Sequence, residues 1–324
     1  MRRILVTGAR GQVGSELTLA LRERYGNNNV IAGDKRKPDE KLLKSCPFEV
    51  IDCTDIGAVK KLVKEYSVDT IYHLAAILSA TAEAKPQLAW DVNINGLYNV
   101  LEIARESKCA VFSPSSIGAF GPTTPRDNTP QDTIQRPDTM YGVTKVAGEL
   151  LCDYYHKRFG VDTRGVRWPG IISSETPPGG GTTDYAVEMF YAAVEQRKYT
   201  CFLKPGTYLD MMYIPDAIRA AIDLMEADHH RLKHRNAFNV TAMSFAPEDI
   251  ADEIRKHIPG FVMDYEIDPV RQAIADSWPN KVDDSAAREE WGWSPDYDLE
   301  TMVEDMIAKL KVKLRNNLLV GSRP

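Results

Sequence analysis

The sequence predicts an α/β protein with a doubly wound parallel sheet and a smaller α/β lobe toward the C-terminus. Two observations carry this prediction. An apolar run at residues 4–6 is followed by three spaced glycines and a helical pattern, and strand-like and helical patterns then alternate through the first half of the chain. Parallel strands need crossover connections, so this alternation predicts a sheet covered by helices on both faces, the Rossmann arrangement.

The glycines after the first strand, Gly8, Gly11 and Gly14, form the first candidate binding element. A glycine turn lets the backbone approach a pyrophosphate, which the unpaired N–H groups of the following helix then bind. The spacing is GxxGxxG and not the usual GxGxxG, and a tight turn can need glycine without a ligand. The second predicted strand, residues 30–34, ends in Asp34, about 20 residues beyond Gly14. A carboxylate there can bind the hydroxyls of an adenosine ribose, so the two features together predict dinucleotide binding.

The later elements continue this alternation and then depart from it. Strands are predicted at residues 48–52, 70–76, 110–113 and 161–167, with helices at 56–66, 88–107 and 141–158. A loop of small residues through Ser79 is predicted to follow the strand at 70–76. Beyond residue 170 the pattern weakens, with helices predicted at 184–196, 216–227, from 246 and at 299–314, and a strand at 237–240. We therefore expect a dinucleotide-binding domain at 1–171, to which 212–242 returns, a substrate-binding lobe at 172–211 and 243–316, and a tail at 317–324.

Composition narrows the class of protein. The 324 residues are 43% hydrophobic and 27% charged, as in ordinary soluble proteins, and the net charge of −6 argues against nonspecific nucleic-acid binding. No apolar run approaches the ~20 residues of a membrane span, and the first strand begins so early that we expect no signal peptide.

Five cysteines without a CxxC pair indicate reduced thiols and a cytoplasmic protein. His229, His230 and His234 lie in a polar run that we interpret as a solvated turn, so no metal is expected.

Tyr141 and Lys145 form the second candidate element. Four positions apart on a predicted helix, the phenol and the ammonium share one face. An ordinary tyrosine titrates near pH ~10, and a neighbouring positive charge favours the phenolate that a general base requires. A serine turn, Ser115 and Ser116, precedes the pair and can supply a hydroxyl to the substrate oxygen. The motif is common by chance on helices, but its place after a glycine turn and a serine turn indicates a Tyr base activated by Lys.

Five further stretches complete a recognisable pattern: YHLAAILSA at 72–80, PSSIGAFGP at 114–122, RWPGIIS at 167–173, GGGTTDYA at 179–186 and SWP at 277–279. With them, the chain resembles the extended short-chain dehydrogenases/reductases, the NAD-dependent epimerase/dehydratase family, and within it the NAD-dependent L-threonine 3-dehydrogenases. Sugar-nucleotide relatives usually carry an Arg-x-Phe-Asn-x-Tyr-Gly-Pro-like stretch where this chain has residues 167–173. That departure favours the threonine branch.

The resemblance implies a role for each matching position. Tyr141 would be the base, Lys145 its activator and a ribose ligand, and Ser116 the hydroxyl partner, with Ser115 left open as an alternative. NAD would be held by Gly8, Gly11, Gln12, Val13, Gly14, Asp34, Lys35, Asp52, Cys53, Leu74, Ala75, Ala76, Asn93, Tyr141, Lys145, Trp168 and Ile171. The substrate would be held by Ser79, Ser116, Tyr141, Gly180, Thr183 and Trp278.

Several of these positions also have a purely structural interpretation. Asn93 would brace the catalytic lysine through water, or would only satisfy backbone groups. Residues 179–184 would form a loop that closes over the amino acid with the hydroxyls of Thr182 and Thr183, or residues 179–181 would be only a linker. Trp278 would line the pocket or pack in the core. Trp90, the apolar face 97–101 and the region of Leu150 would be core or a subunit contact, and the family pairing of these helices implies a homodimer.

The expected reaction is the NAD-dependent oxidation of the 3-hydroxyl of L-threonine to 2-amino-3-oxobutanoate, a step of threonine catabolism. One alternative is a sugar-nucleotide epimerase or dehydratase that regenerates its NAD. The other is a dinucleotide-sensing binding protein without catalysis, against which Tyr141 and Lys145 argue.

Asp34 would also favour NAD over NADP, although the basic residues 35–37 argue in the opposite direction.

Overall fold

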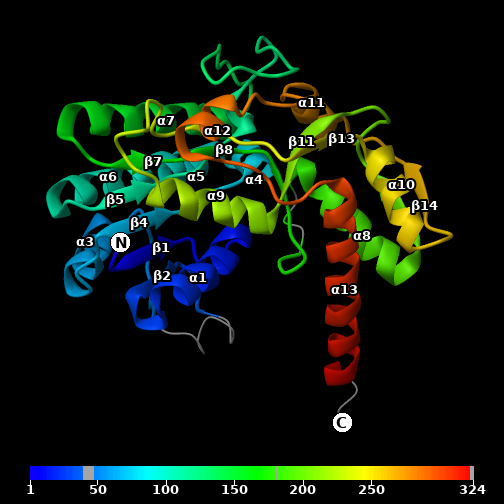
Figure 1. The fold of residues 1–324 in the computed structure, drawn as a ribbon, viewed down its shortest axis with the longest axis horizontal. Coiled ribbons are helices and arrows are strands. Elements are labelled where there is room, and N and C mark those ends of the chain that lie inside the picture. Colours follow the sequence, from blue (N-terminus) through cyan, green and yellow to red (C-terminus); the bar gives the residue numbers. More distant parts are fainter. Residues whose placement is uncertain (39–46, 178, 180, 322–324) are drawn as a thin grey trace.

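The computed structural model describes residues 1–38, 47–177, 179 and 181–321 (Figure 1). Its main sheet has six strands in the order β3–β2–β1–β4–β5–β7, and every pairing is parallel. The strands are β1 (Ile4–Thr7), β2 (Val30–Asp34), β3 (Phe48–Val50), β4 (Thr70–His73), β5 (Ala110–Phe112) and β7 (Thr163–Arg164). The order reverses between β1 and β4, which is where doubly wound sheets bind ligands. The predicted fold class is confirmed.

Helices cover both faces of this sheet because its strands are apolar on both sides (Figure 1). On β1, Leu5 points to a cluster with α3 (Ile56–Glu65), α6 (Gly96–Ser107) and α7 (Met140–Phe159). Ile4 and Val6 point the other way, to α1 (Gln12–Tyr25), α9 (Ile214–Glu226) and α12 (Ser285–Trp291). Fully buried side chains on successive positions explain why the strand reads as a continuous apolar run.

Two three-stranded sheets extend the structure beyond β5. In the first, β8 (Val166–Trp168) lies between β6 (Ser115–Ser116) and β12 (Phe238–Asn239), and both pairings are parallel. In the second, β11 (Leu209–Tyr213) pairs in parallel with β9 (Gly170–Ile172) and antiparallel with β13 (Met243–Phe245). The strand predicted at 237–240 is thus β12, and it pairs with β8, whose other neighbour is the serine strand β6.

A separate hydrophobic cluster forms the part of the molecule at the right of Figure 1. Its helices are α8 (Tyr185–Gln196), α10 (Pro247–His257), α11 (Pro269–Asp276) and the long α13 (Leu299–Gly321). A parallel pair, β10 (Lys198–Cys201) and β14 (Val262–Tyr265), lies at its edge.

Three local predictions need correction. The helix predicted at 88–107 is α5 (Pro86–Trp90), a π-helical turn at Asp91–Asn95, and α6. The loop predicted around Ser79 is a helix, α4 (Ser79–Ala84). The strand predicted at 161–167 is divided at Gly165 into β7, which pairs with β5, and β8, which pairs with β6 and β12.

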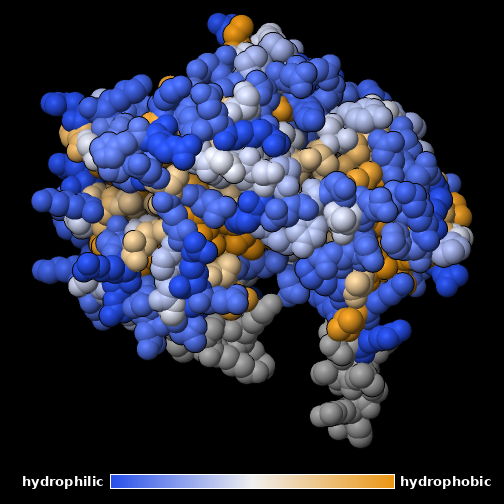
Figure 2. All heavy atoms as spheres, viewed as in Figure 1, coloured by the Kyte–Doolittle hydropathy of each residue, from blue (hydrophilic) through white to orange (hydrophobic). Residues whose placement is uncertain are grey.

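The surface is mostly hydrophilic on the face shown in Figure 2. Among the described residues, no helix has the length and apolar character needed to cross a membrane. Of the residues with two interpretations, Leu97 and Leu101 belong to the core, whereas Trp90 and Leu150 are 43% and 63% exposed. A subunit contact through the exposed pair stays a prediction.

Candidate active site

A cavity of about 230 Å³ opens at the carboxyl ends of the central strands. Of the residues singled out from the sequence, it is lined by Gly8, Gly11, Gln12, Val13, Gly14, Leu74, Ala76, Ser79, Ser115, Ser116, Tyr141, Lys145, Trp168, Ile171, Thr183 and Trp278. Those outside its lining are Asp34, Lys35, Asp52, Cys53, Ala75 and Asn93. Gly180 lies outside the described residues. Sequence reasoning missed Leu78, Pro114, Ile117, Pro169 and Gly170, whereas the lining residues Gly181, Thr182 and Asp184 belong to the loop expected to close over the amino acid.

The glycine turn fits a pyrophosphate. Gly8 has a φ of +72°, and a Cβ on it would lie 2.6 Å from the backbone nitrogen of Ala75. A Cβ on Gly14 would lie 2.1 Å from the carbonyl oxygen of Gly8. Helix α1 begins at Gln12 with no side-chain cap and no acidic residue in its first turn among the described residues. Its backbone N–H groups therefore face the cavity edge without a negative neighbour, as an anion site requires.

The carboxylate of Asp34 lies at the end of β2, where an adenosine ribose is expected. It accepts hydrogen bonds from the backbone nitrogens of Arg10 and Arg36, both at 2.9 Å, and from the Arg36 guanidinium. Burial alone would raise the pKa of Asp34, but the Arg36 side chain and these two amides lower it below its usual range. The carboxylate is thus held ionised, the form that accepts from ribose hydroxyls.

The other residues predicted to hold the adenosine contact one another. Lys35 forms an ion pair with Asp52 at 2.7 Å, and this contact holds the pKa of Asp52 below its usual range. Cys53 is buried against α6, where a Cβ on Gly96 would lie 2.8 Å from its sulfur. The three residues thus lie just after the ends of β2 and β3, and a role in binding adenine stays a prediction.

Tyr141 and Lys145 lie on one face of α7, as predicted. Thr139 caps this helix by accepting from the Gly142 nitrogen at 3.0 Å. The Lys145 Nζ lies 5.4 Å from the centre of the Tyr141 ring and donates to the carbonyl oxygen of Pro114 at 2.8 Å. A Cβ on Gly118 would lie 3.1 Å from the Tyr141 ring and 3.5 Å from the Ser116 hydroxyl. The absence of a side chain there lets phenol, ammonium and hydroxyl converge on one wall of the cavity.

The two serines differ in their hydrogen bonds. Ser115 donates to the buried carboxylate of Glu149, which also accepts two hydrogen bonds from Arg167, at 2.9 and 2.8 Å, and one from Gln135. Ser116 accepts from the Gly118 nitrogen at 3.1 Å, which leaves its hydroxyl hydrogen for a ligand. The structure therefore favours Ser116 as the hydroxyl partner. Glu149 was missed, although its spacing of four from Lys145 places it on the same helix face.

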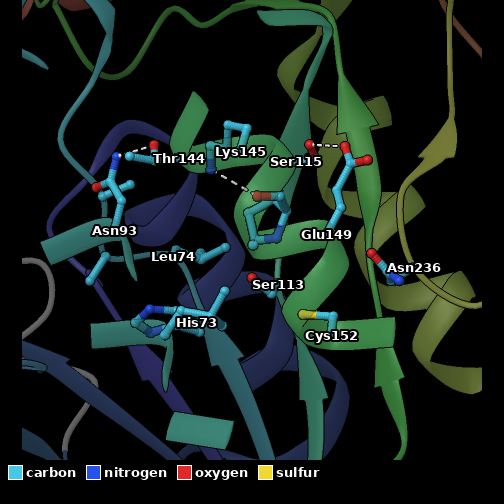
Figure 3. A pocket seen from close by; sticks show the side chains of 15 residues that line it. His73, Leu74, Asn93, Ser113, Ser115, Thr144, Lys145, Glu149, Cys152 and Asn236 are labelled. Atoms are coloured by element: carbon cyan, nitrogen blue, oxygen red, sulfur yellow. Dashed lines mark hydrogen bonds between the residues drawn. The ribbon is translucent and has the colours of Figure 1, made fainter. Parts of the chain in front are cut away.

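A second, smaller cavity of about 30 Å³ lies behind Lys145 (Figure 3). Asn93 faces it, accepts from the Ile77 nitrogen at 2.7 Å, and donates to the Ile77 oxygen and the Thr144 hydroxyl. These bonds satisfy backbone groups, and among the described residues none joins Asn93 directly to Lys145. The bracing of Lys145 through water stays a prediction.

His73, at the end of β4, also lines this smaller cavity (Figure 3) and was not singled out from the sequence. Its Nδ1 is 2.8 Å from the Thr7 hydroxyl. Burial, and secondarily the charge of Lys145, lower the pKa of His73 to about 3, so the imidazole is neutral. Its Nε2 is buried with no hydrogen-bond partner among the described residues.

The far end of the larger cavity offers polar groups to a ligand. Thr182 is buried, and its hydroxyl has no hydrogen-bond partner within the described part of the chain; the same holds for the indole nitrogen of Trp168. Unpaired buried polar atoms are costly, so their presence indicates a polar ligand. Trp278 both packs in the hydrophobic cluster and lines the cavity, so its two interpretations coexist.

Comparison with known proteins agrees with this geometry. The model of the NAD dependent epimerase/dehydratase family matches residues 4–241. An uncharacterized epimerase/dehydratase of Staphylococcus haemolyticus is 57% identical over 98% of this chain and 100% of its own length. The X-ray structure of L-threonine dehydrogenase from Clostridium difficile is 58% identical, with a TM-score of 0.95 over 97% of this chain and 98% of that one. A monomeric L-threonine 3-dehydrogenase from a metagenome is 48% identical, with a TM-score of 0.92 over 96% and 99% of the two chains.

Proposed function

The chain belongs to the NAD dependent epimerase/dehydratase family, and we propose that within it the protein is an L-threonine 3-dehydrogenase. The convergence of Tyr141, Lys145 and Ser116 on one cavity, beside a glycine turn that fits a pyrophosphate, carries the proposal. Its specific substrate is supported by similarity to proteins named L-threonine dehydrogenases over nearly their whole length.

The cofactor is NAD, and the described residues fit it. Gly8, Gly11 and Gly14 with the start of α1 would hold the pyrophosphate, and Asp34 would hold the adenosine ribose. When bound, NAD supplies the acceptor for the hydride that leaves C3 of the substrate. The protein's own contribution is to orient the 3-hydroxyl and to remove its proton.

Removal of the proton falls to Tyr141. In the proposed step, its phenolate oxygen accepts the proton of the 3-hydroxyl while the C3–H bond gives up its hydride, which leaves the ketone of 2-amino-3-oxobutanoate. The Lys145 ammonium, held on the Pro114 carbonyl, stabilises the phenolate by its charge. The Ser116 hydroxyl donates to the substrate oxygen and so orients it. General-base catalysis of this kind contributes about 10²–10⁴ in rate.

Recognition of the amino acid needs polar groups in a dry site, because threonine is small and zwitterionic. Ser79 and Thr183 line the cavity with Thr182, whose hydroxyl has no hydrogen-bond partner among the residues that the structure describes. We assign the amino-acid end of the cavity to these hydroxyls, with Trp278 packing along the substrate's apolar side.

The experiment is an assay of NADH formation by the purified protein with L-threonine, L-serine, UDP-glucose and dTDP-glucose. We expect NADH with L-threonine, and no turnover of the sugar nucleotides. Tyr141→Phe should lower the rate by about 10²–10⁴, whereas the control Tyr154→Phe, an exposed tyrosine on the same helix, should not change it. Epimerisation or dehydration of a sugar nucleotide without release of NADH would contradict the proposal, as would more than a tenth of the activity in Tyr141→Phe.

A further inference from the structure

Strand β9 lies between the helix that would receive the pyrophosphate and the turn that carries Thr182 and Thr183. On one side, Gln12 at the start of α1 donates from its side-chain nitrogen to the carbonyl oxygen of Ile171 at 3.3 Å. On the other side, Thr183 packs on the bare backbone of Gly170, where an added Cβ would lie 2.7 Å from the threonine methyl. A movement of α1 would therefore displace β9, and through β9 it would displace Thr183.

Ser173, immediately after β9, makes a second contact with α1. Its hydroxyl oxygen accepts from the backbone nitrogens of Glu175 and Thr176, at 3.1 and 3.4 Å. Its hydrogen is donated to the Glu16 carboxylate at 2.7 Å. Glu16 is one helical turn after Gln12, so both contacts come from the same face of α1. Because Ser173 is fully buried, Glu16 fixes the orientation of the hydroxyl and with it the turn over residues 173–176.

The other side of this turn is attached to the substrate-binding part of the molecule. Lys313 of α13 donates to the carbonyl oxygens of Ser174 and Glu175, at 2.8 and 2.7 Å. The Tyr191 hydroxyl of α8 donates to the Ser174 oxygen at 3.1 Å. The turn is thus held between α1 on one side and α8 and α13 on the other.

We infer that Glu16 and Ser173 are positioning residues that couple NAD binding at α1 to amino-acid binding at Thr182 and Thr183. NAD binding restricts the motion of the start of α1. The Glu16–Ser173 contact extends this restriction to β9 and to the turn that carries Thr182 and Thr183. The amino-acid half of the inference rests on the proposed function. By thermodynamic linkage, the amino acid then tightens NAD by the same factor as NAD tightens the amino acid, typically about 5- to 150-fold.

The first test follows the cofactor alone and does not depend on the identity of the substrate. Hydrogen–deuterium exchange is measured on the segment 181–185 with and without NAD, in the wild type, Glu16→Ala and Ser173→Ala, because alanine at either position removes the Glu16–Ser173 hydrogen bond. Glu23→Ala is the control, because Glu23 is exposed on the same helix. NAD should slow exchange of the segment in the wild type and in the control, and should leave it unchanged in the other two variants. Equal protection in all four proteins would overturn the inference, as would no protection in the wild type.

The second test measures the coupling itself. The Kd of NAD is determined by calorimetry with and without saturating L-2-aminobutyrate, a threonine analogue that has no 3-hydroxyl to oxidise. The wild type and Glu23→Ala should bind NAD about 5-fold or more tightly with the analogue, whereas Glu16→Ala should show a ratio near one. A ratio in Glu16→Ala equal to that of the wild type contradicts the coupling. If no analogue binds to the wild type while NAD still protects the segment, the substrate assignment fails and the transmission through Glu16 stands.

Discussion

Replacing the two neighbouring serines one at a time should give opposite results. Ser115 and Glu149 are 6% and 7% exposed, and the carboxylate accepts from the Ser115 hydroxyl, from Arg167 and from Gln135. A hydrogen bond to a buried charge contributes about 1.5–3 kcal/mol. Ser115→Ala removes one of four such bonds and leaves the ion pair intact, so the free energy of unfolding should fall by about that amount. Because Ser116 keeps its place, kcat should fall less than about 10-fold.

Ser116→Ala should behave in the other way. Its hydroxyl accepts only from the Gly118 nitrogen within the described residues, a bond at the surface of the cavity, so little stability is lost. The loss of one oriented donor at the reacting oxygen costs about 10²–10³ in kcat. Urea unfolding and NADH formation, measured on both variants, give the comparison. A large loss of kcat in Ser115→Ala with none in Ser116→Ala would refute the assignment of the two hydroxyls.

Three further predictions concern the ligands and pH. The Asp34 carboxylate would repel a 2′-phosphate, and it binds the Arg36 side chain that could otherwise attract one. The ratio of kcat/KM should therefore strongly favour NAD over NADP. Equal kcat/KM for the two cofactors would be inconsistent with ribose binding by Asp34. Thr183→Ala should weaken threonine binding by about 1–3 kcal/mol with little change in the Kd of NAD. An equal loss of affinity for both ligands would show that Thr183 is not part of the amino-acid site. The pKa of His73 is about 3 in the fold against 6.5 in a free side chain, so the unfolded chain binds a proton that the folded chain excludes. Stability should therefore fall as pH is lowered from about 6.5 toward 3, more steeply in the wild type than in His73→Gln, and equal slopes in urea unfolding would contradict this.

The elements predicted from the sequence are those that leave a recognisable pattern in a short stretch of residues. The run at residues 4–6 is apolar because β1 is buried on both faces, and Gly14 is needed because a Cβ would meet the backbone of Gly8. The spacing of four between Tyr141 and Lys145 places them on one helix face in any fold. The two spacings depend on neighbours within a few residues, and the burial of β1 by distant helices is recorded in its own apolar side chains. These signals led to the fold class, the glycine turn and the Tyr/Lys pair.

The features that were missed depend on partners far along the chain. Glu149 is buried because Arg167 and Ser115 reach it from two strands, and an isolated glutamate on a helix gives no sign of this. The neutrality of His73 follows from its burial at the carboxyl end of β4, between helices and strands that are distant in the sequence. Short strands such as β10 and β14, with exposed positions in each, lack the apolar pattern that identifies β1.

The central claim is that the hydride leaves C3 of L-threonine as its hydroxyl loses a proton to Tyr141. The most direct measurement is the mass of the NADH formed from L-threonine deuterated at C3. The account predicts NADH that carries one deuterium, together with a slower reaction than with ordinary threonine when the chemical step limits the rate. Unlabelled NADH from the deuterated substrate, or no NADH at all from L-threonine, would contradict it.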